Sequence, residues 1–258
     1  MTGDQMFERE VGAKISAVAL ALFGLAGNAS ADEAKFGYSL SITGSSDYIF
    51  RGISYTSQAP TINVYNEFTY GIAYLGLWTS TINYGTLGPY EQDIYLGLRP
   101  VTGPISWDLA AQYYIYGNRD HGQFGSVFDT SYLEFKVGAT ASPVKNLMVG
   151  TNVFLIPDQG YAATNNLSLE GAVSYDLPQI GEFSPSVSGL IGWSHSGTNK
   201  YYPTGYWEGL QQYTYWNAGL KLTVDKYFMD FRYWGTSIDH NDIASDRFVF
   251  SAGVNLLP

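Results

Sequence analysis

Apolar and polar residues alternate along most of the chain after residue 35, with the period of two that a β-strand gives to its two faces. The alternation is most regular from Ile105 to Gly117, where the odd positions are apolar and the even ones include Ser106, Asp108 and Gln112. Strands of this kind are typical of membrane barrels, in which one face meets lipid and the other faces the interior.

Twelve segments show this alternation over the length that a tilted membrane strand needs. The connections between them alternate between short ones of two to six residues and long ones of seven to sixteen, which is typical of outer-membrane barrels. An open sheet edge is not tolerated in lipid, so the strands must close on themselves. We therefore predict an all-β fold, a transmembrane antiparallel up-and-down β-barrel of about 12 strands over 36–53, 61–70, 74–84, 93–100, 105–117, 130–141, 146–156, 165–176, 183–195, 212–224, 227–237 and 246–257.

The composition agrees with this class of protein. Charged residues make up only 14% of the chain and aromatic residues 16%, and the charges on the predicted strands gather on one face. A soluble β-sandwich would instead carry lysine and glutamate on its outer face. The chain has no cysteine, which excludes disulfides and thiolate metal sites. With a net charge of −10 and no basic stripe, we expect no nucleic-acid partner and no cofactor.

The N-terminal segment has the pattern of a cleavable signal peptide over residues 1–31. Lys14 precedes an apolar run over 15–26, too short for a permanent membrane helix, and Ala29-Ser30-Ala31 precedes an acidic start. We predict cleavage between Ala31 and Asp32, and a barrel over 32–258. The expected location is the outer membrane of a Gram-negative bacterium, reached through the periplasm, with outer-membrane lipid and the barrel insertion machinery as partners.

The stretch from Ser46 to Gly52 alternates aromatic residues with charged and small ones. We interpret it as the continuation of the first strand, with Tyr48 and Phe50 facing lipid and Asp47 and Arg51 facing the interior. The two inward charges would be about 13 Å apart and too far to pair with each other. Each needs a partner from another strand, and inward Arg247 of the last strand is the candidate for Asp47.

Charged residues at inward positions predict the lining of the barrel. Two interpretations are open: a channel wall that biases the passage of small solutes or ions, or a packed, salt-bridged interior. Acids outnumber bases in the set, so a pore would have a modest cation preference. A non-conducting structural or adhesion barrel is the alternative function. The predicted lining residues are Asp47, Arg51, Glu67, Asp93, Arg99, Asp108, Glu134, Lys136, Glu170, Asp230 and Arg232.

Other chemistry has weaker support. An outer-membrane lipid-modifying enzyme would need a serine and a base within hydrogen-bond reach, and the only histidines are His121, His195 and His240. The run 239–242, Asp-His-Asn-Asp, is interpreted as a turn rather than a cation site. The aromatic residues of 200–216 predict an outer aromatic girdle, with a sugar-stacking loop as the alternative.

The run S-x-T-G-S-S-D-Y-I-F-R-G-I-S, which begins at Ser41, resembles the opening of the TorF family of outer-membrane porins. The resemblance continues through Pro60-Thr-Ile-Asn-Val-Tyr and through Glu91-x-Asp93-x-Tyr95-x-Gly97, and reaches the ending from Asp246 to Ser251. It covers nearly the whole mature chain. What it implies is an outer-membrane β-barrel that forms a pore; it implies no substrate and no site residues.

Overall fold

The computed structural model describes residues 35–85, 87–117 and 130–257. Within these residues the chain forms twelve long strands, with a short hairpin, β2 (Ile49–Phe50) and β3 (Ile53–Ser54), after the first of them. The long strands are β1 (Phe36–Ser45), β4 (Thr61–Tyr70), β5 (Ala73–Thr81), β6 (Tyr90–Leu98), β8 (Ile105–Tyr116), β9 (Tyr132–Val144), β10 (Leu147–Ile156), β11 (Asn166–Asp176), β12 (Ser184–Ser196), β13 (Gln212–Val224), β14 (Tyr227–Thr236) and β15 (Arg247–Leu257).

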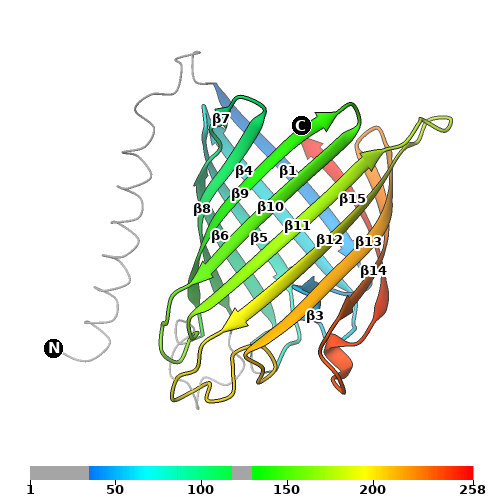
Figure 1. Ribbon diagram of the computed structural model, residues 1–258. Helices are drawn as coiled ribbons and strands as arrows, with labels where there is room; N and C mark the ends of the chain where they lie inside the picture. Colours follow the sequence, from blue (N-terminus) through cyan, green and yellow to red (C-terminus); the bar gives the residue numbers. More distant parts are fainter. Residues whose placement is uncertain (1–34, 86, 118–129, 258) are drawn as a thin grey trace.

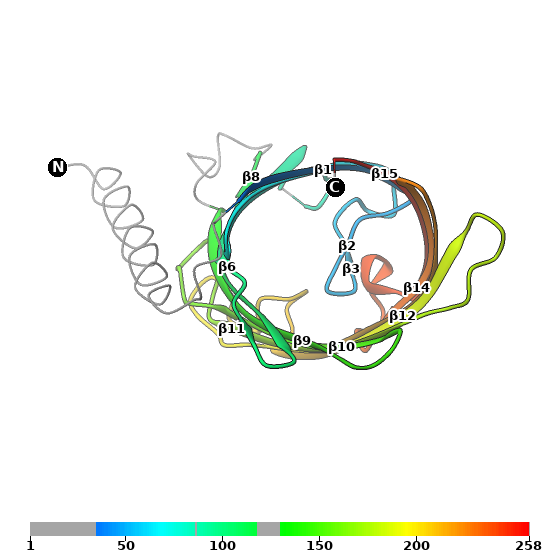
Figure 2. The same cartoon turned by 90° about the horizontal axis from the view of Figure 1, so that it is seen from above.

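The twelve strands close into a barrel, as predicted. Each pairs antiparallel with its neighbours along the chain, β6 pairs with β8 past the two-residue strand β7 (Val101–Thr102), and β1 pairs with β15. Figure 2 shows the resulting ring, with the β2–β3 hairpin inside it. No open strand edge is left in the wall, which satisfies the backbone hydrogen bonds that lipid would leave unpaired.

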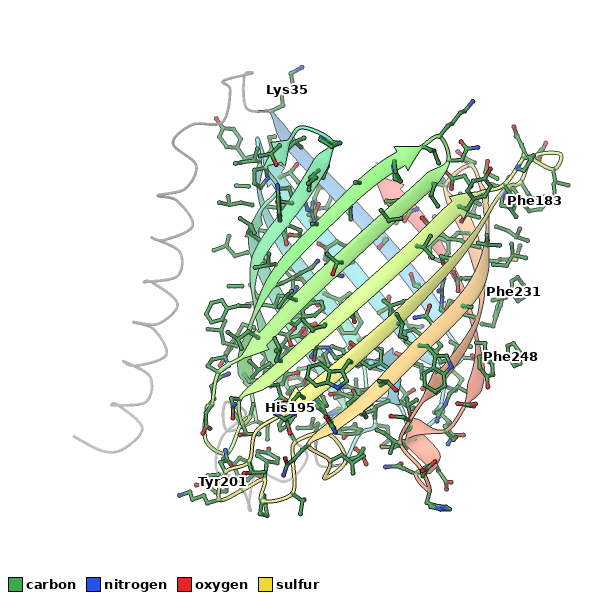
Figure 3. All side chains as sticks on the ribbon, viewed as in Figure 1. Lys35, Phe183, His195, Tyr201, Phe231 and Phe248 are labelled. Carbon is green, nitrogen blue, oxygen red and sulfur yellow. The ribbon has the colours of Figure 1, made fainter. Side chains whose placement is uncertain are left out.

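The two faces of each strand follow the alternation of the sequence. Phe231 and Phe248 are 47% and 81% exposed and point away from the barrel (Figure 3). On β5, Leu75 faces outward and Tyr74 faces inward. None of the helices among the described residues is long and apolar enough to cross a membrane.

The connections differ at the two ends of the barrel. The C-terminal end of β15 and the short turns lie at one end, and the long loops and the β2–β3 hairpin lie at the other (Figure 1). We call these the short-turn end and the long-loop end. Lys35 lies at the short-turn end (Figure 3). The predicted signal peptide with its Ala31–Asp32 cleavage site, the loop that carries His121, and Pro258 lie outside the described residues.

The main correction to the sequence prediction concerns residues 46–53, which do not continue the first strand. The wall strand β1 ends at Ser45, opposite Thr61, where β4 begins. The chain then turns into the barrel and forms the β2–β3 hairpin, which pairs Ile49 with Ser54 and Phe50 with Ile53. The long-loop half of the interior is therefore packed rather than open.

The hairpin turns on Arg51 and Gly52, whose φ angles of 49° and 85° are both in the left-handed region. A two-residue turn with positive φ at both positions matches the right-handed twist of the flanking strands, and glycine reaches such angles at little cost. A Cβ atom on Gly52 would also lie 2.4 Å from the Cγ2 atom of Thr236 and 2.9 Å from the Cβ atom of Tyr215. Glycine is thus needed both for the turn and for the approach of the hairpin to the barrel wall.

Candidate functional site

Arg51, at the tip of the hairpin, reaches the opposite wall of the barrel. Its Nη2 atom lies 2.7 Å from Oε2 of Glu134, and both side chains are almost fully buried. The guanidinium carbon also lies 4.5 Å from the ring centroid of Phe154 and 4.7 Å from that of Phe50. Arg51 therefore faces the interior, as predicted, and its partner comes from another strand.

Asp47, at the base of the hairpin, is held from both sides. The hydroxyl groups of Ser54 and Thr56 each donate to its Oδ1 atom at 2.6 Å. Arg247 of β15 donates from Nη1 to its Oδ2 atom at 3.0 Å. The predicted pairing of Asp47 with Arg247 is thus confirmed, and it ties the hairpin to the seam between the first and last strands.

The prediction that Tyr48 and Phe50 face lipid is wrong, because the segment has left the wall. The Tyr48 ring packs 5.0 Å from that of Trp78, and its hydroxyl donates to Glu91 at 3.4 Å. Phe50 packs with its ring centroid 5.9 Å from that of Tyr114. Both rings belong to the interior cluster that fills the long-loop half of the barrel.

Ion pairs on the wall account for most of the remaining predicted lining residues. Arg99 donates to both carboxylate oxygens of Glu67 at 2.7 Å. Lys136 donates to Asp108 at 2.7 Å, and Tyr74 donates to the other oxygen of that carboxylate at 2.7 Å. A third pair joins Arg232 to Asp230 at 2.9 Å on β14. These charges are compensated in place, so they leave little net field inside the barrel.

Two cavities occupy the interior between the hairpin and the short-turn end. The first, about 450 Å³, lies against Phe50 and Arg51 of the hairpin and is also lined by Lys136 and Glu170. The second, about 470 Å³, is lined by Lys221 and Arg232 among others. Both include Trp234 in their walls, so they adjoin each other. The polar space inside the barrel thus runs up to the hairpin from the short-turn side.

Three interior carboxylates on the strands have no ion-pair partner among the described residues: Glu91, Asp93 and Glu170. Asp93 is fully buried and accepts a hydrogen bond from Tyr95. Glu170 accepts from Tyr215 at 2.8 Å. All eleven predicted lining residues therefore lie inside the barrel, Asp47 and Arg51 on the hairpin and the rest on or beside the wall strands.

Sequence reasoning missed two interior charges. Glu91 is fully buried at the start of β6, whereas the prediction began that strand at Asp93. Lys221 sits on β13 with its ammonium group 4.4 Å from the ring centroid of Phe228. Glu91 shares the parity of Asp93, and Lys221 has the opposite parity to the outward Trp216, so the alternation itself was the signal.

The candidates for catalysis are not brought together. His195 is exposed on the outer face of β12 and stacks on Trp193 at 5.7 Å, whereas its neighbours Ser194 and Ser196 are buried on the inner face. His240 lies in a long loop with a positive φ. Among residues 35–85, 87–117 and 130–257 no group of three or more His, Cys, Asp or Glu side chains is arranged to hold a metal ion.

The run 239–242 lies in the loop between β14 and β15, with a bend at His240. The Asn241 side chain accepts from the Ile243 backbone N–H at 3.1 Å and so caps the short 3₁₀ helix η2 (Asp242–Ala244).

The aromatic girdle prediction is wrong for the loop before β13. Trp207 is only 2% exposed, and its ring packs 4.7 Å from Tyr206, inside the long-loop mouth of the barrel. Trp216, on β13, does lie at an outward position.

Solved structures with the same fold include two porins at low sequence identity. A NanC porin matches with a TM-score of 0.55 and 10% identity, over 83% of this chain and 98% of that one. A KdgM porin matches with a TM-score of 0.52 and 6% identity, over 84% and 97%. LpxR from Salmonella typhimurium gives 0.49 and 10% over 85% and 100%, a score too low to support an argument about function.

Comparison of the sequence identifies a family but assigns no function. No curated protein matches the sequence. The TorF name is not among the matches, so that resemblance stays a prediction. A family model described as a bacterial protein of unknown function, Gcw_chp, matches residues 28–254, which is the barrel nearly from end to end. This twelve-stranded barrel, with a charged hairpin folded into its lumen, therefore belongs to the Gcw_chp family of bacterial proteins of unknown function.

Proposed function

We propose that this protein is a porin-like channel of the Gram-negative outer membrane that lets small solutes or ions diffuse passively. The observation that carries the proposal is the polar interior: two adjoining cavities of about 450 and 470 Å³, lined by inward charges, run from the short-turn end to the hairpin. The likeness of the fold to the NanC and KdgM porins is consistent with it. The proposal assigns no catalytic residue and no cofactor.

The passage is narrow because the β2–β3 hairpin and the long loops fill the far half of the barrel. Ile53, Tyr116 and Tyr132 are at most 1% exposed in that half. Conduction of anything larger than a small ion then requires the hairpin to move. The Arg51–Glu134 and Asp47–Arg247 ion pairs hold it in place and are the contacts that such a movement breaks.

We attribute a cation preference to the inward charged positions, among which acids outnumber bases by seven to four. Glu170 lines the first cavity and has no ion-pair partner among the described residues, whereas Glu91 and Asp93 are at most 1% exposed and line neither cavity. Fixed carboxylates along a narrow polar passage raise the local concentration of cations and repel anions. The preference is modest, because most of the interior charge is paired.

Conductance in planar lipid bilayers tests the proposal. The refolded mature chain is expected to give small channels whose reversal potential in a salt gradient favours cations, and Glu170→Gln is expected to weaken that preference. Deletion of the hairpin residues Ile49–Ser54 should raise the conductance. A reversal potential favouring anions would contradict the charge argument.

The packed long-loop half favours a second candidate, a structural or adhesion barrel that does not conduct. Its fully buried side chains resemble a protein core more than a channel wall. If neither the natural chain nor the Ile49–Ser54 deletion conducts, although both are folded and inserted, the channel proposal is rejected and this second function is favoured.

A further inference from the structure

A third cavity, separate from the lumen, lies among the long loops. It has a volume of about 210 Å³ and shares no lining residue with the two lumen cavities. Figure 3 shows the loop that carries Tyr201 at this end of the barrel. The aromatic side chains of the cavity lining are Tyr55, Tyr84, Tyr161, Tyr202, Tyr206 and Trp207.

The tyrosine rings of the lining are fixed by contacts with one another and can be reached from solvent. Tyr55 and Tyr84 stack with their centroids 4.6 Å apart, and Tyr206 packs edge-on against Tyr202 at 4.8 Å. The side chains that are partly exposed are Tyr84, Tyr161, Tyr202 and Tyr206. A ligand therefore meets preformed ring surfaces and orders few side chains on binding.

A carboxylate lies directly beside this aromatic lining. Glu208 sits in the tight turn that pairs Trp207 with Leu210. Its Oε1 atom accepts from the Tyr84 hydroxyl, and its Oε2 atom accepts from the Asn241 amide at 2.6 Å. Both donors are neutral, and Glu208 has no ion-pair partner among the described residues. Its negative charge is therefore uncompensated and is bonded to one of the rings that a ligand would meet.

The tyrosine hydroxyls of the lining stay protonated at physiological pH. Burial and the Glu208 carboxylate raise the pKa of the Tyr84 hydroxyl well above its usual value. Burial raises the pKa of Tyr202 to about 12 and that of Tyr206 well above its usual value. The rings are therefore neutral, and the face of a neutral ring carries partial negative charge.

Two basic side chains next to the lining are engaged elsewhere. Arg51, whose guanidinium carbon lies 5.8 Å from the ring centroid of Trp207, is paired with Glu134 at 2.7 Å. The ammonium group of Lys200 lies 4.6 Å from the ring centroid of Tyr201, which is not part of the lining. None of the described lining residues is basic. The cavity thus has negative charge beside it and no cation of its own among these residues.

We infer that this cavity binds a compact organic cation, a quaternary ammonium group of the choline type, at the long-loop mouth of the barrel. Aromatic ring faces attract a cation, and the attraction is stronger when the cation is desolvated. The Glu208 carboxylate adds a Coulomb attraction that a neutral ligand does not feel. The inference does not depend on conduction, because a closed barrel would have the same cavity.

Other classes of ligand fit this cavity less well. An anion would be repelled by Glu208. A small metal ion takes several oxygen ligands, and in the described part of the chain no group of three or more His, Cys, Asp or Glu side chains is arranged to hold one. The volume of about 210 Å³ is below the roughly 300–1,000 Å³ of pockets for drug-sized ligands, which restricts the ligand to a small cation or a head group.

Saturation-transfer difference NMR on the full mature chain, in a sugar-based detergent without choline head groups, tests the inference. Choline is compared with dimethylbutanol, its neutral isostere, in which a carbon atom replaces the quaternary nitrogen. Choline is expected to bind saturably and about 2- to 30-fold more tightly than the isostere. Glycerophosphocholine is the third probe: tighter binding than choline assigns the site to a lipid head group, and weaker binding assigns it to a free cation.

Two substitutions change the site itself. Glu208→Gln keeps an acceptor for Tyr84 but removes the charge, so it should weaken choline binding about three- to tenfold and leave dimethylbutanol binding unchanged. Tyr202→Leu removes one ring and should weaken choline binding about two- to fivefold. The matched controls are Glu182→Gln and Tyr175→Leu, at exposed positions of the short-turn end, and both should leave binding unchanged.

Three results overturn the inference. The first is that choline does not bind, and the second is that dimethylbutanol binds as tightly as choline; both are measured on the natural chain and need no variant to fold. The third is that folded Glu208→Gln binds choline as well as Glu182→Gln does, because the cation would then be held elsewhere, for example by Glu170 of the lumen.

Discussion

The buried pair Arg51–Glu134 makes a quantitative prediction about the hairpin. Glu134→Gln keeps the size of the side chain but leaves the Arg51 guanidinium buried without a counter-charge. Removing one partner of a buried ion pair costs about 3–5 kcal/mol. Because every 1.4 kcal/mol is a factor of ten, the equilibrium between the seated and the displaced hairpin should shift about 100- to 4,000-fold toward displacement.

The chain has no cysteine, so a single introduced thiol reports on that equilibrium. Ile53 is fully buried on β3, and the thiol introduced by Ile53→Cys reacts with a soluble reagent only when the hairpin is displaced. With fast reclosing, the labelling rate is proportional to the displaced population. Glu134→Gln should therefore speed labelling by the same factor of about 100 to 4,000.

Glu67→Gln is the matched control. It breaks an ion pair of the same length, but the Arg99 partner is 43% exposed, and no hydrogen bond or ion pair among the described residues joins either side chain to the hairpin. An exposed pair contributes about 0.2–1 kcal/mol, so labelling should change less than about fivefold. Equal labelling rates in the Glu134→Gln and Glu67→Gln backgrounds would refute the reasoning, because they would mean that the buried pair does not hold the hairpin.

Three further predictions follow from the packing. Gly52→Ala places a Cβ atom 2.4 Å from Thr236 at a φ of 85°, so it should speed labelling of the Ile53→Cys thiol, whereas Gly44→Ala, with no atom within 4 Å of its Cβ, should not. Arg247→Met should speed labelling less than Glu134→Gln does, because Ser54 and Thr56 still donate to Asp47. Phe231→Arg should lower the free energy of unfolding in lipid vesicles by about 2–4 kcal/mol in urea titrations, and Phe248→Arg, nearer the long-loop end, by about 0–1 kcal/mol. Equal losses at these two positions would argue against the membrane depth assigned to them.

The pattern of residues by itself determined the barrel. Eleven of the twelve wall strands lie within a few residues of the predicted ranges, and the apolar faces point outward as expected from Ile105 to Leu256. This succeeded because the information is local: a period of two separates the faces, and connection length separates the two ends. The same alternation placed charges such as Asp108, Lys136 and Arg232 inside the barrel.

The interpretation of residues 46–53 as a continuation of the first strand was wrong, because the local pattern does not distinguish a hairpin from a wall strand. A hairpin alternates as a wall strand does, so its sequence reads as a continuation of β1. The chain leaves the wall after Ser45 because β4 begins at Thr61, directly opposite Ser45. Beyond that point β4 offers no backbone groups with which a longer β1 could pair. The left-handed φ angles of Arg51 and Gly52, which make the turn, are a property of the folded chain and are not visible in the alternation.

The sequence thus determined the wall, its faces and the set of charges that point inward. Apart from the Asp47–Arg247 pair, which the sequence predicted, only the tertiary structure decided which of those charges meet. Arg51 and Glu134, for example, are brought together by closure of the barrel around the hairpin that follows the first strand. It also decided that Trp207 and its tyrosine neighbours line a cavity instead of a lipid-facing girdle. Such contacts join segments far apart in the chain, and their geometry depends on which strands close the ring.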